Sequence, residues 1–254
     1  MLHYQPKHDL LSGKTLLVTG AGDGIGREAA LTYARFGASL ILVGRTQHKL
    51  EAVSQEIETL TGKAADIYVV DLLTAPHEQY VELANDIAKK HPYLDGVLHN
   101  AGLLGVVAPI IEQPVDLWHD VMQVNVNASF MLTQVLLPLL LKAPTASLVF
   151  TSSSVGKKGR ADWGAYSVSK FATEGLMQIL AEEYKNSGLR VNCINPGRTR
   201  TSMRASAAPD EDPMTIKAPA DIMPIYLYLM SNDSLRKTGI SFDAQPAQNV
   251  KTTE

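Results

Sequence analysis

Tyr166 and Lys170 stand four residues apart, a spacing at which two side chains share one face of an α-helix. The pKa of a free tyrosine is about 10, too high for the phenol to act as a base near neutral pH. A neighbouring ammonium group favours the phenolate and lowers that pKa. Lowering it by about three units needs about 4 kcal/mol, more than one partly solvated ammonium supplies. The pair is therefore compatible with proton transfer assisted by a second positive charge. The spacing alone also fits an exposed helical pair without function, so the prediction depends on the residues that accompany it.

A glycine-rich turn follows the first apolar run of the chain, at 15–19, and precedes a segment of helical spacing at 25–36. Glycines in such a turn let the backbone approach a pyrophosphate, while the helix N-terminus offers unpaired N–H groups and the positive end of its dipole. The alternative is a turn that only packs tightly, and a P-loop is disfavoured because no Gly-Lys-Ser/Thr follows. We predict a dinucleotide site made by Gly20, Gly22, Asp23, Gly24, Ile25 and Gly26.

Short runs rich in Val, Ile and Leu alternate along the chain with longer segments of helical spacing, as in a parallel sheet covered by helices on both faces. The predicted strands are 15–19, 39–43, 67–70, 96–99, 147–151, 190–195 and 239–242. The predicted helices are 25–36, 47–61, 77–91, 115–141, 163–186 and 219–230. Because no repeat or linker interrupts this order, we predict one doubly wound (Rossmann) α/β domain over 1–254, with a seven-stranded parallel sheet.

One stretch, 197–219, fits neither pattern and is composed mostly of Arg, Ser, Ala, Pro and acidic residues. A structureless loop of about 20 residues in a compact domain is either functional or disordered. This loop follows a strand at the edge where ligands bind in open α/β sheets. We predict a flexible substrate lid at about 198–218, with a loop of no function as the alternative.

The glycine spacing, Thr-Gly-x-x-x-Gly-x-Gly, resembles that of the short-chain dehydrogenase/reductase family. The resemblance continues along the chain through Asp71-Leu72, Asn100-Ala101-Gly102, Asn125, Ser153, the Tyr-x-x-x-Lys motif of Tyr166 and Lys170, and Pro196-Gly197 with Thr201. These motifs span residues 15–203, and the order of elements covers nearly the whole chain. The resemblance implies an oxidoreductase that transfers a hydride between NAD(P)(H) and a carbonyl or alcohol substrate.

The resemblance also implies a role for each matching residue. Tyr166 is expected to be the acid/base and Lys170 also to hold the nicotinamide ribose. Ser153 is expected to position the substrate oxygen and Asn125 to sustain a proton relay through water. Hydroxyl groups that bond the developing alkoxide stabilise charge that appears only in the transition state. Further contacts with the cofactor are expected from Asp71, Leu72, Asn100, Ala101, Gly102, Pro196, Gly197, Thr199 and Thr201.

Two of these assignments have alternatives. Ser152, Ser153 and Ser154 are consecutive, but the thirteen-residue distance to Tyr166 favours Ser153, and alternation along a strand points Ser152 the other way. Asn125 could instead be a helix-interior residue whose side chain satisfies local backbone groups.

The end of the second strand bears on the choice of cofactor. A carboxylate there would accept the ribose 2′-OH and repel a 2′-phosphate. This chain has Arg45 instead, whose planar guanidinium suits phosphate, with Thr46 and His48 nearby. We therefore predict NADP(H), with NAD(H) possible, although Asp23 in the glycine turn argues against a phosphate.

Composition narrows the possible classes of protein. The formal net charge is -3 and no run reaches five residues of like charge, so neither nucleic-acid binding nor membrane binding is indicated. The single cysteine, Cys193, excludes a disulfide framework and a cysteine-rich metal site, and we predict no metal. The apolar run 135–141 is too short to span a bilayer. We expect a cytoplasmic protein. The family resemblance implies a homodimer or homotetramer assembled through the helices at 115–141 and 163–186, which their apolar content permits.

Two other functions stay open: a cofactor-sensing regulator on the same fold, or an NADP-dependent epimerase. The substrate is largely beyond sequence reasoning. A group of cations hints at an acidic substrate, although ordinary solvated charges explain them as well; they are Lys157, Lys158, Arg160, Arg200 and Arg204.

Overall fold

The computed structural model describes residues 4–246 and has seven strands in one sheet. The strands are β1 (Thr15–Thr19), β2 (Ser39–Gly44), β3 (Asp66–Val69), β4 (Gly96–His99), β5 (Ala146–Thr151), β6 (Leu189–Asn195) and β7 (Ile240–Asp243). All neighbours pair in parallel, in the order β3-β2-β1-β4-β5-β6-β7. The predicted seven-stranded parallel sheet is confirmed, and the bounds of β2, β3, β5, β6 and β7 differ by one residue from those expected.

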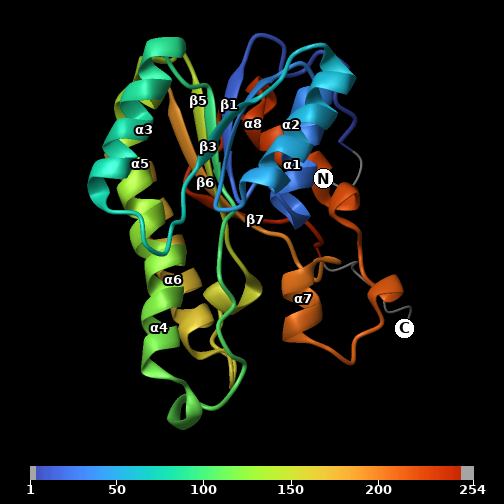
Figure 1. Ribbon diagram of the computed structural model, residues 1–254, viewed down its shortest axis with the longest axis vertical. Helices are drawn as coiled ribbons and strands as arrows, with labels where there is room; N and C mark the ends of the chain where they lie inside the picture. Colours follow the sequence, from blue (N-terminus) through green and yellow to red (C-terminus); the bar gives the residue numbers. More distant parts are fainter. Residues whose placement is uncertain (1–3, 247–254) are drawn as a thin grey trace, which may run out of the picture.

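Helices cover both faces of the sheet (Figure 1). One face carries α1 (Gly24–Arg35), α2 (Gln47–Thr61) and α8 (Met223–Met230). The other carries α3 (His77–Lys90), α5 (Ala128–Lys142) and α6 (Gly164–Glu183), and α4 (Val115–Met122) packs against α6. The predicted layers are therefore present, with the parallel sheet buried between them.

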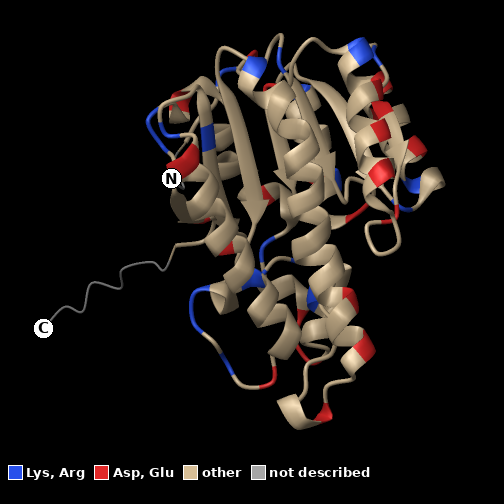
Figure 2. Cartoon of the chain, turned by 90° about the vertical axis from the view of Figure 1, so that its left-hand side faces the viewer, with Lys and Arg blue, Asp and Glu red and all other residues tan. Residues whose placement is uncertain are grey.

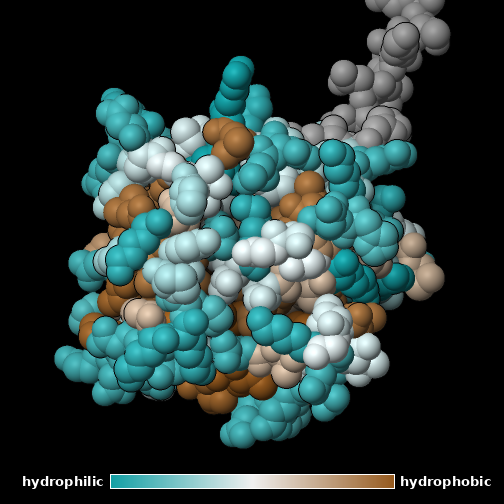
Figure 3. Space-filling view, turned by 90° about the horizontal axis from the view of Figure 1, so that it is seen from above, coloured by the Kyte–Doolittle hydropathy of each residue, from teal (hydrophilic) through white to brown (hydrophobic). Residues whose placement is uncertain are grey.

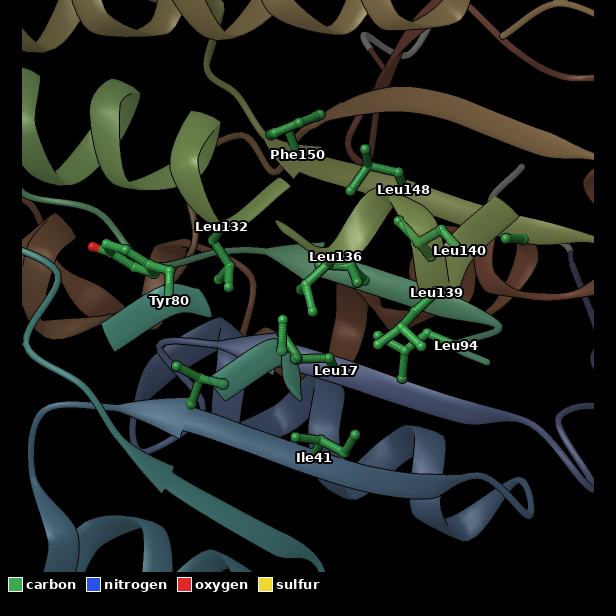
Figure 4. Close-up of a cluster of buried hydrophobic side chains, with 14 of the residues drawn as sticks. Leu17, Ile41, Tyr80, Leu94, Leu132, Leu136, Leu139, Leu140, Leu148 and Phe150 are labelled. Atoms are coloured by element: carbon green, nitrogen blue, oxygen red, sulfur yellow. The ribbon is translucent and has the colours of Figure 1, made fainter. Parts of the chain in front are cut away.

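The strands read as continuous apolar runs because each of their faces packs against helices. In β1, Leu17 belongs to the core under α5, whereas Leu16 and Val18 belong to the core under α1 and α8. All three are fully buried. Figure 4 shows Leu132 and Leu136 of α5 lying over Leu17. Charges of both signs are instead spread over the outer helices and loops, and the sheet is nearly free of them (Figure 2).

The strand order places a crevice at one edge of the sheet. From β1 the chain first builds outward through β2 and β3, then crosses back to place β4 on the other side of β1. Such a switch of direction leaves a crevice outside the carboxyl ends of the strands, where ligands bind in this class of fold. The opposite edge, seen from above in Figure 3, is a mostly hydrophilic surface with scattered apolar side chains.

The long helix predicted at 115–141 is interrupted. A π-helical turn, Gln123–Asn127, separates α4 from α5, and Asn125 lies within it. Such turns are rare inside helices and occur frequently at functional sites. The other predicted boundaries shift less: α6 ends at Glu183, and α8 begins after a 3₁₀ turn, Pro219–Ile222.

The prediction of a structureless segment after β6 is wrong, because the segment contains local structure. A short helix, α7 (Ser202–Ala207), begins where the Thr201 hydroxyl accepts a hydrogen bond from the Arg204 N–H, 3.1 Å away. A 3₁₀ turn, Pro213–Thr215, follows. Arg200 N–H also bonds the Lys217 carbonyl at 2.8 Å, which joins the two ends of the segment. Its flexibility stays a prediction.

By length and composition alone, the described chain has one helical stretch that could cross a membrane, Val115–Lys142, with a mean hydropathy of 1.6 over its most apolar window. Half of that window is buried inside the protein. Leu132, Leu136, Leu139 and Leu140 of this stretch belong to the core beneath it. Packing against the sheet therefore accounts for its apolar composition.

Candidate active site

A cavity of about 570 Å³ opens at the carboxyl ends of β1, β4, β5 and β6, in the crevice between the two halves of the sheet. The predicted site residues that line it are Gly20, Asp23, Gly24, Ile25, Asn100, Ala101, Gly102, Ser153, Tyr166, Lys170, Pro196, Gly197, Thr199 and Thr201. Those that do not line it are Gly22, Gly26, Arg45, Asp71, Leu72 and Asn125. The fold thus brings most of the predicted catalytic and cofactor residues to one concave site.

The glycine turn passes very close to the end of β4. Gly20 has a φ of 65°, and a Cβ on it would lie 3.0 Å from the Cα of Ala101. A Cβ on Gly26 would overlap the carbonyl oxygen of Gly20. The Thr19 hydroxyl accepts hydrogen bonds from two N–H groups after β4, at 3.0 and 3.1 Å. Positions 20 and 26 of this crossing have no room for a side chain, and the N-terminus of α1 is left facing the cavity.

We predict that Gly26→Ala destabilises the protein by about 1–3 kcal/mol and impairs NADPH binding, because the new methyl group meets backbone that cannot move aside. Urea unfolding and NADPH fluorescence titration measure both effects. Gly175→Ala is the matched control, since a Cβ at this position of α6 meets nothing within 4 Å. It should be neutral or stabilising by up to about 1 kcal/mol. Equal behaviour of the two variants would contradict the crossing described above.

Tyr166 and Lys170 line the cavity from the first turns of α6. The Lys170 Nζ lies 5.5 Å from the centroid of the Tyr166 ring and donates a hydrogen bond to the Thr151 carbonyl at 2.8 Å. Burial lowers the pKa of Lys170 to about 8, against the opposing influence of Cys193 and Glu174. Burial also raises the pKa of Tyr166 to about 12, although a hydrogen bond with Ser153 acts in the opposite direction. The protein alone therefore holds a neutral phenol, and ionising it needs a further positive charge.

The consecutive serines after β5 differ in their hydrogen bonds. The Ser153 hydroxyl lies by Tyr166 and accepts a hydrogen bond from the Val155 N–H at 3.4 Å. The Ser152 hydroxyl donates instead to the carboxylate of Glu174, 2.5 Å away and buried in α6. This difference agrees with the alternation expected along the strand, and it leaves Ser153 as the serine beside the phenol.

Asn125 is 3 % exposed and uses its side chain on the protein itself. Its Oδ1 accepts from the Leu103 N–H at 2.7 Å, and its Nδ2 donates to the Leu103 carbonyl and to the Ser169 hydroxyl, both at 2.9 Å. Both N–H bonds of the amide are therefore occupied. The geometry fits the alternative reading, in which this side chain satisfies local groups and fixes the loop after β4 against α6.

The loop after β6 closes the cavity from the other side. Gly197 has a φ of 72°, and Thr199 is buried with its hydroxyl near the Pro196 carbonyl at 3.3 Å. Thr201, which caps α7, approaches the glycine turn, since a Cβ on Gly24 would lie 3.4 Å from its Cγ2. The end of β6 and the start of α1 thus form adjoining walls of the cavity.

The cofactor residues predicted at β2 and β3 lie beside the cavity rather than in it. Arg45 follows β2 and is exposed, and no hydrogen bond or ion pair within residues 4–246 engages it. Asp71 accepts a hydrogen bond from the Leu73 N–H at 3.1 Å. Asp23 caps α1 and pairs with Lys49 of α2 at 2.8 Å, and this hydrogen bond lowers the pKa of Asp23. The paired carboxylate repels a phosphate less than a free one would.

Sequence reasoning missed one buried charge behind the site. Glu174 accepts from the hydroxyls of Ser152 and of Ser241 in β7, the latter at 2.7 Å, and it acts electrostatically on Lys170. The spacing Tyr166, Lys170, Glu174 continues one face of a helix, so the periodicity contained the signal. No group of three or more His, Cys, Asp or Glu residues able to hold a metal ion occurs among residues 4–246.

The chain is similar over most of its length to known proteins of one family. The sequence profile of the family described as short chain dehydrogenase matches residues 14–212. The uncharacterised oxidoreductase YciK of Escherichia coli K12 is 64% identical over 247 residues, which cover 97% of this chain and 98% of the relative. Both matches confirm the resemblance to this family that the sequence motifs predicted.

Two solved structures of relatives carry a cofactor. A putative short chain dehydrogenase from Escherichia coli CFT073, complexed with NADPH, has a TM-score of 0.94 at 64% identity and covers 95% of this chain and 100% of its own. Another from Shigella flexneri 2a, complexed with NADP, has a TM-score of 0.93 at 63% identity, with coverages of 94% and 100%. This chain therefore belongs to the short-chain dehydrogenase family.

Proposed function

We propose that the protein is an NADP(H)-dependent oxidoreductase that interconverts a carbonyl group and an alcohol, with Tyr166 as the acid/base. The observation that carries this proposal is the common cavity of the Tyr166–Lys170 pair and the glycine turn before α1. The NADP and NADPH complexes of the two relatives support the choice of cofactor. The close crossing at Gly20 and Gly26 fits a pyrophosphate, because it keeps side chains away from the N-terminus of α1.

When bound, the nicotinamide supplies or accepts the hydride. In the reduction direction, the neutral phenol of Tyr166 gives its proton to the substrate oxygen, and the Ser153 hydroxyl bonds the same oxygen. The buried ammonium of Lys170 stabilises the phenolate that remains. We propose Asn125 as a positioning residue, since its side chain fastens the loop after β4 to α6 instead of donating into the cavity.

We propose that Arg45 selects NADP(H) by binding the 2′-phosphate. Arg45→Ala should weaken NADPH binding about 10- to 100-fold, the effect of losing a charge-assisted hydrogen bond of about 1.5–3 kcal/mol, and should leave NADH binding nearly unchanged. Titration of both cofactors by nicotinamide fluorescence measures the two affinities. Arg35→Ala removes another exposed cation, at the far end of α1, and should change neither. Equal losses for NADPH and NADH would refute the assignment.

The activity itself is tested with purified protein, NADPH or NADP⁺, and a panel of ketones, aldehydes and alcohols. Turnover with net oxidation or reduction of the cofactor supports the proposal. Binding of NADPH without turnover, together with a protein partner whose affinity depends on the cofactor, would favour the regulator. Product formation without net consumption of NADPH would favour the epimerase.

We also propose a homo-oligomer assembled through α5 and α6. Both helices leave large apolar side chains exposed within the described chain, namely Phe130 of α5 and Val168, Phe171 and Ile179 of α6. Exposed apolar side chains, where they gather into a patch, are typical of protein–protein contacts.

A further inference from the structure

The cavity beside Tyr166 is lined by an excess of positive charge. Its charged lining residues are Asp23, Arg160, Lys170, Arg198 and Arg204. The one carboxylate among them, Asp23, is paired with Lys49 at the cofactor end. Lys170 is buried and belongs to the acid/base pair. The remaining three are arginines, which come from two different walls: the loop before α6 and the segment after β6.

Arg204 of α7 is held in a fixed orientation. Its Nε and Nη2 donate to the two carboxylate oxygens of Glu211, at 2.6 and 2.8 Å. Glu211 lies outside the lining of the cavity, whereas Arg204 belongs to it. The guanidinium therefore turns one edge to Glu211 and keeps Nη1, which has no partner within residues 4–246, for other contacts. A guanidinium locked this way loses little entropy when it binds a second anion.

Arg198 is bound to the same carboxylate, at 2.9 Å, but two-thirds of its side chain is exposed. The Arg204 side chain is better buried, with only 23 % of it exposed. The pair shares one negative charge, so this wall of the cavity keeps a net positive charge. Glu211 thus orients Arg204 without cancelling the local field.

Arg160 stands on the opposite wall and has neither a hydrogen bond nor an ion pair from its side chain to the rest of the described chain. Its loop is fastened: the Asp162 carbonyl accepts a hydrogen bond from the Ala108 N–H at 2.9 Å, and Asp162 has a φ of 72°. A left-handed conformation in a residue other than glycine costs energy and is found where surrounding structure imposes it. The loop therefore brings to the cavity an exposed cation that no side chain within residues 4–246 neutralises.

Apolar side chains line the same cavity. The Trp163 ring lies 5.8 Å from the Tyr166 ring, and Leu104 and Met203 also line the cavity. Along the chain, Arg160, Trp163 and Tyr166 follow one another at intervals of three residues. The cavity that holds Tyr166 therefore offers a substrate both apolar side chains and the cation of Arg160.

We propose that the substrate is an oxo acid or hydroxy acid whose carboxylate, remote from the reacting carbon, is bound by Arg160 and Arg204. This inference rests on the proposed function, because it names the class of substrate for the same site. The aromatic and apolar lining receives the carbon skeleton, and the two arginines receive the charge. Glu211 is a positioning residue, because its two hydrogen bonds orient the Arg204 guanidinium.

Binding of unreactive probes to the NADPH complex tests the inference without turnover. The probes are two matched pairs, benzoate with benzamide and cyclohexanecarboxylate with cyclohexanecarboxamide, titrated by calorimetry. We expect at least one acid to bind tenfold or more tightly than its amide. Arg160→Gln and Arg204→Gln should each reduce that ratio about tenfold, as expected for one lost charge-assisted hydrogen bond. If neither acid binds better than its amide, the inference is overturned.

Arg200→Gln is the matched control. It removes the same charge from the same segment, but Arg200 does not line the cavity and lies instead near Met214. It should leave the ratio unchanged, and an equal fall in this variant would show a diffuse field rather than a site. Glu211→Gln should weaken benzoate and not benzamide, since Arg204 loses its orientation; tighter benzoate binding would contradict the role of Glu211.

The affinity for NADPH is measured first in every variant. Failure of the unaltered protein to bind NADPH would count against the proposed function itself. Normal NADPH binding combined with equal affinities for acid and amide would count only against the carboxylate site. If Arg204→Gln weakened NADPH as much as benzoate, this arginine would serve the cofactor, and the inference would fall.

Discussion

Replacing Tyr166 by Phe is expected to lower kcat for carbonyl reduction about 10²- to 10⁴-fold, the usual contribution of a positioned general acid. The phenol is raised in pKa to about 12 by burial in the cavity, so it carries its proton into the reaction. Phe keeps the ring, its contact with Trp163 and its packing over Lys170. NADPH affinity should therefore stay within about threefold of the unaltered value. Stopped-flow or steady-state rates on the best substrate of the panel measure the loss.

Tyr33→Phe is the control, because it also replaces a tyrosine by Phe and removes one phenolic hydroxyl. The Tyr33 hydroxyl is fully buried in α1 and has no hydrogen-bond partner among residues 4–246. Removing an unpaired buried hydroxyl costs nothing or stabilises, so kcat should not change. If Tyr166→Phe turned over a genuine substrate as fast as this control does, the acid/base role would be lost and another proton donor would have to be sought.

The sheet was predictable because a parallel sheet buried on both faces leaves a strong pattern. Leu16, Leu17 and Val18 are all apolar, since β1 serves two cores at once. The glycine turn was predictable because its purpose is steric, and only Gly fits where Gly26 meets the Gly20 carbonyl. Errors of one residue at the strand ends are of little consequence, since terminal hydrogen bonds are the weakest part of each assignment.

The interruption at Asn125 could not be read from periodicity. The π-helical turn Gln123–Asn127 inserts into a stretch whose apolar pattern runs on through 115–141, and its reason is a long-range contact. Asn125 reaches the backbone of Leu103, twenty-two residues away, and Ser169 on another helix. Such bonds depend on how α4, α5 and α6 pack, and no local rule states them.

The segment after β6 escaped prediction for a related reason. The six residues of α7 are too few to show a helical period, and short helices gain their stability from tertiary contacts. Here α7 is instead held by the Thr201 cap and by the ion pair of Arg204 with Glu211, which lies seven residues on, beyond the end of the helix. Likewise, Asp23 argued against NADP(H) in the sequence because its ion pair with Lys49, twenty-six residues on, cannot be predicted from local sequence.

Replacing Lys170 by Met is expected to abolish turnover and yet to stabilise the fold at pH 7. The pKa of Lys170 is lowered from 10.5 to about 8 by burial, so folding carries a penalty for keeping this ammonium charged. The difference between the two values corresponds to roughly 3 kcal/mol. Against it stands the hydrogen bond to the Thr151 carbonyl, about 1 kcal/mol, which Met cannot make. We expect Lys170→Met to gain about 1–2 kcal/mol in urea unfolding at pH 7, with Leu176→Met of the same helix, outside the cavity, as a substitution control.

The pH dependence of the stability difference between Lys170→Met and the unaltered protein distinguishes the loss of a buried charge from better packing of Met. Between pH 8 and 10.5 the unfolded chain binds more protons at Lys170 than the folded chain does, so the stability of the unaltered protein rises with pH relative to Lys170→Met. The advantage of the variant should be full below pH 8 and should disappear as the pH approaches 10.5. An advantage independent of pH would mean that Met only packs better, and a less stable variant at pH 7 would mean that the ammonium is stabilised in the fold. The Lys170 ammonium costs the fold stability, and the phenolate of Tyr166 needs it. Its presence in the cavity is therefore explained by the reaction and not by the stability of the fold.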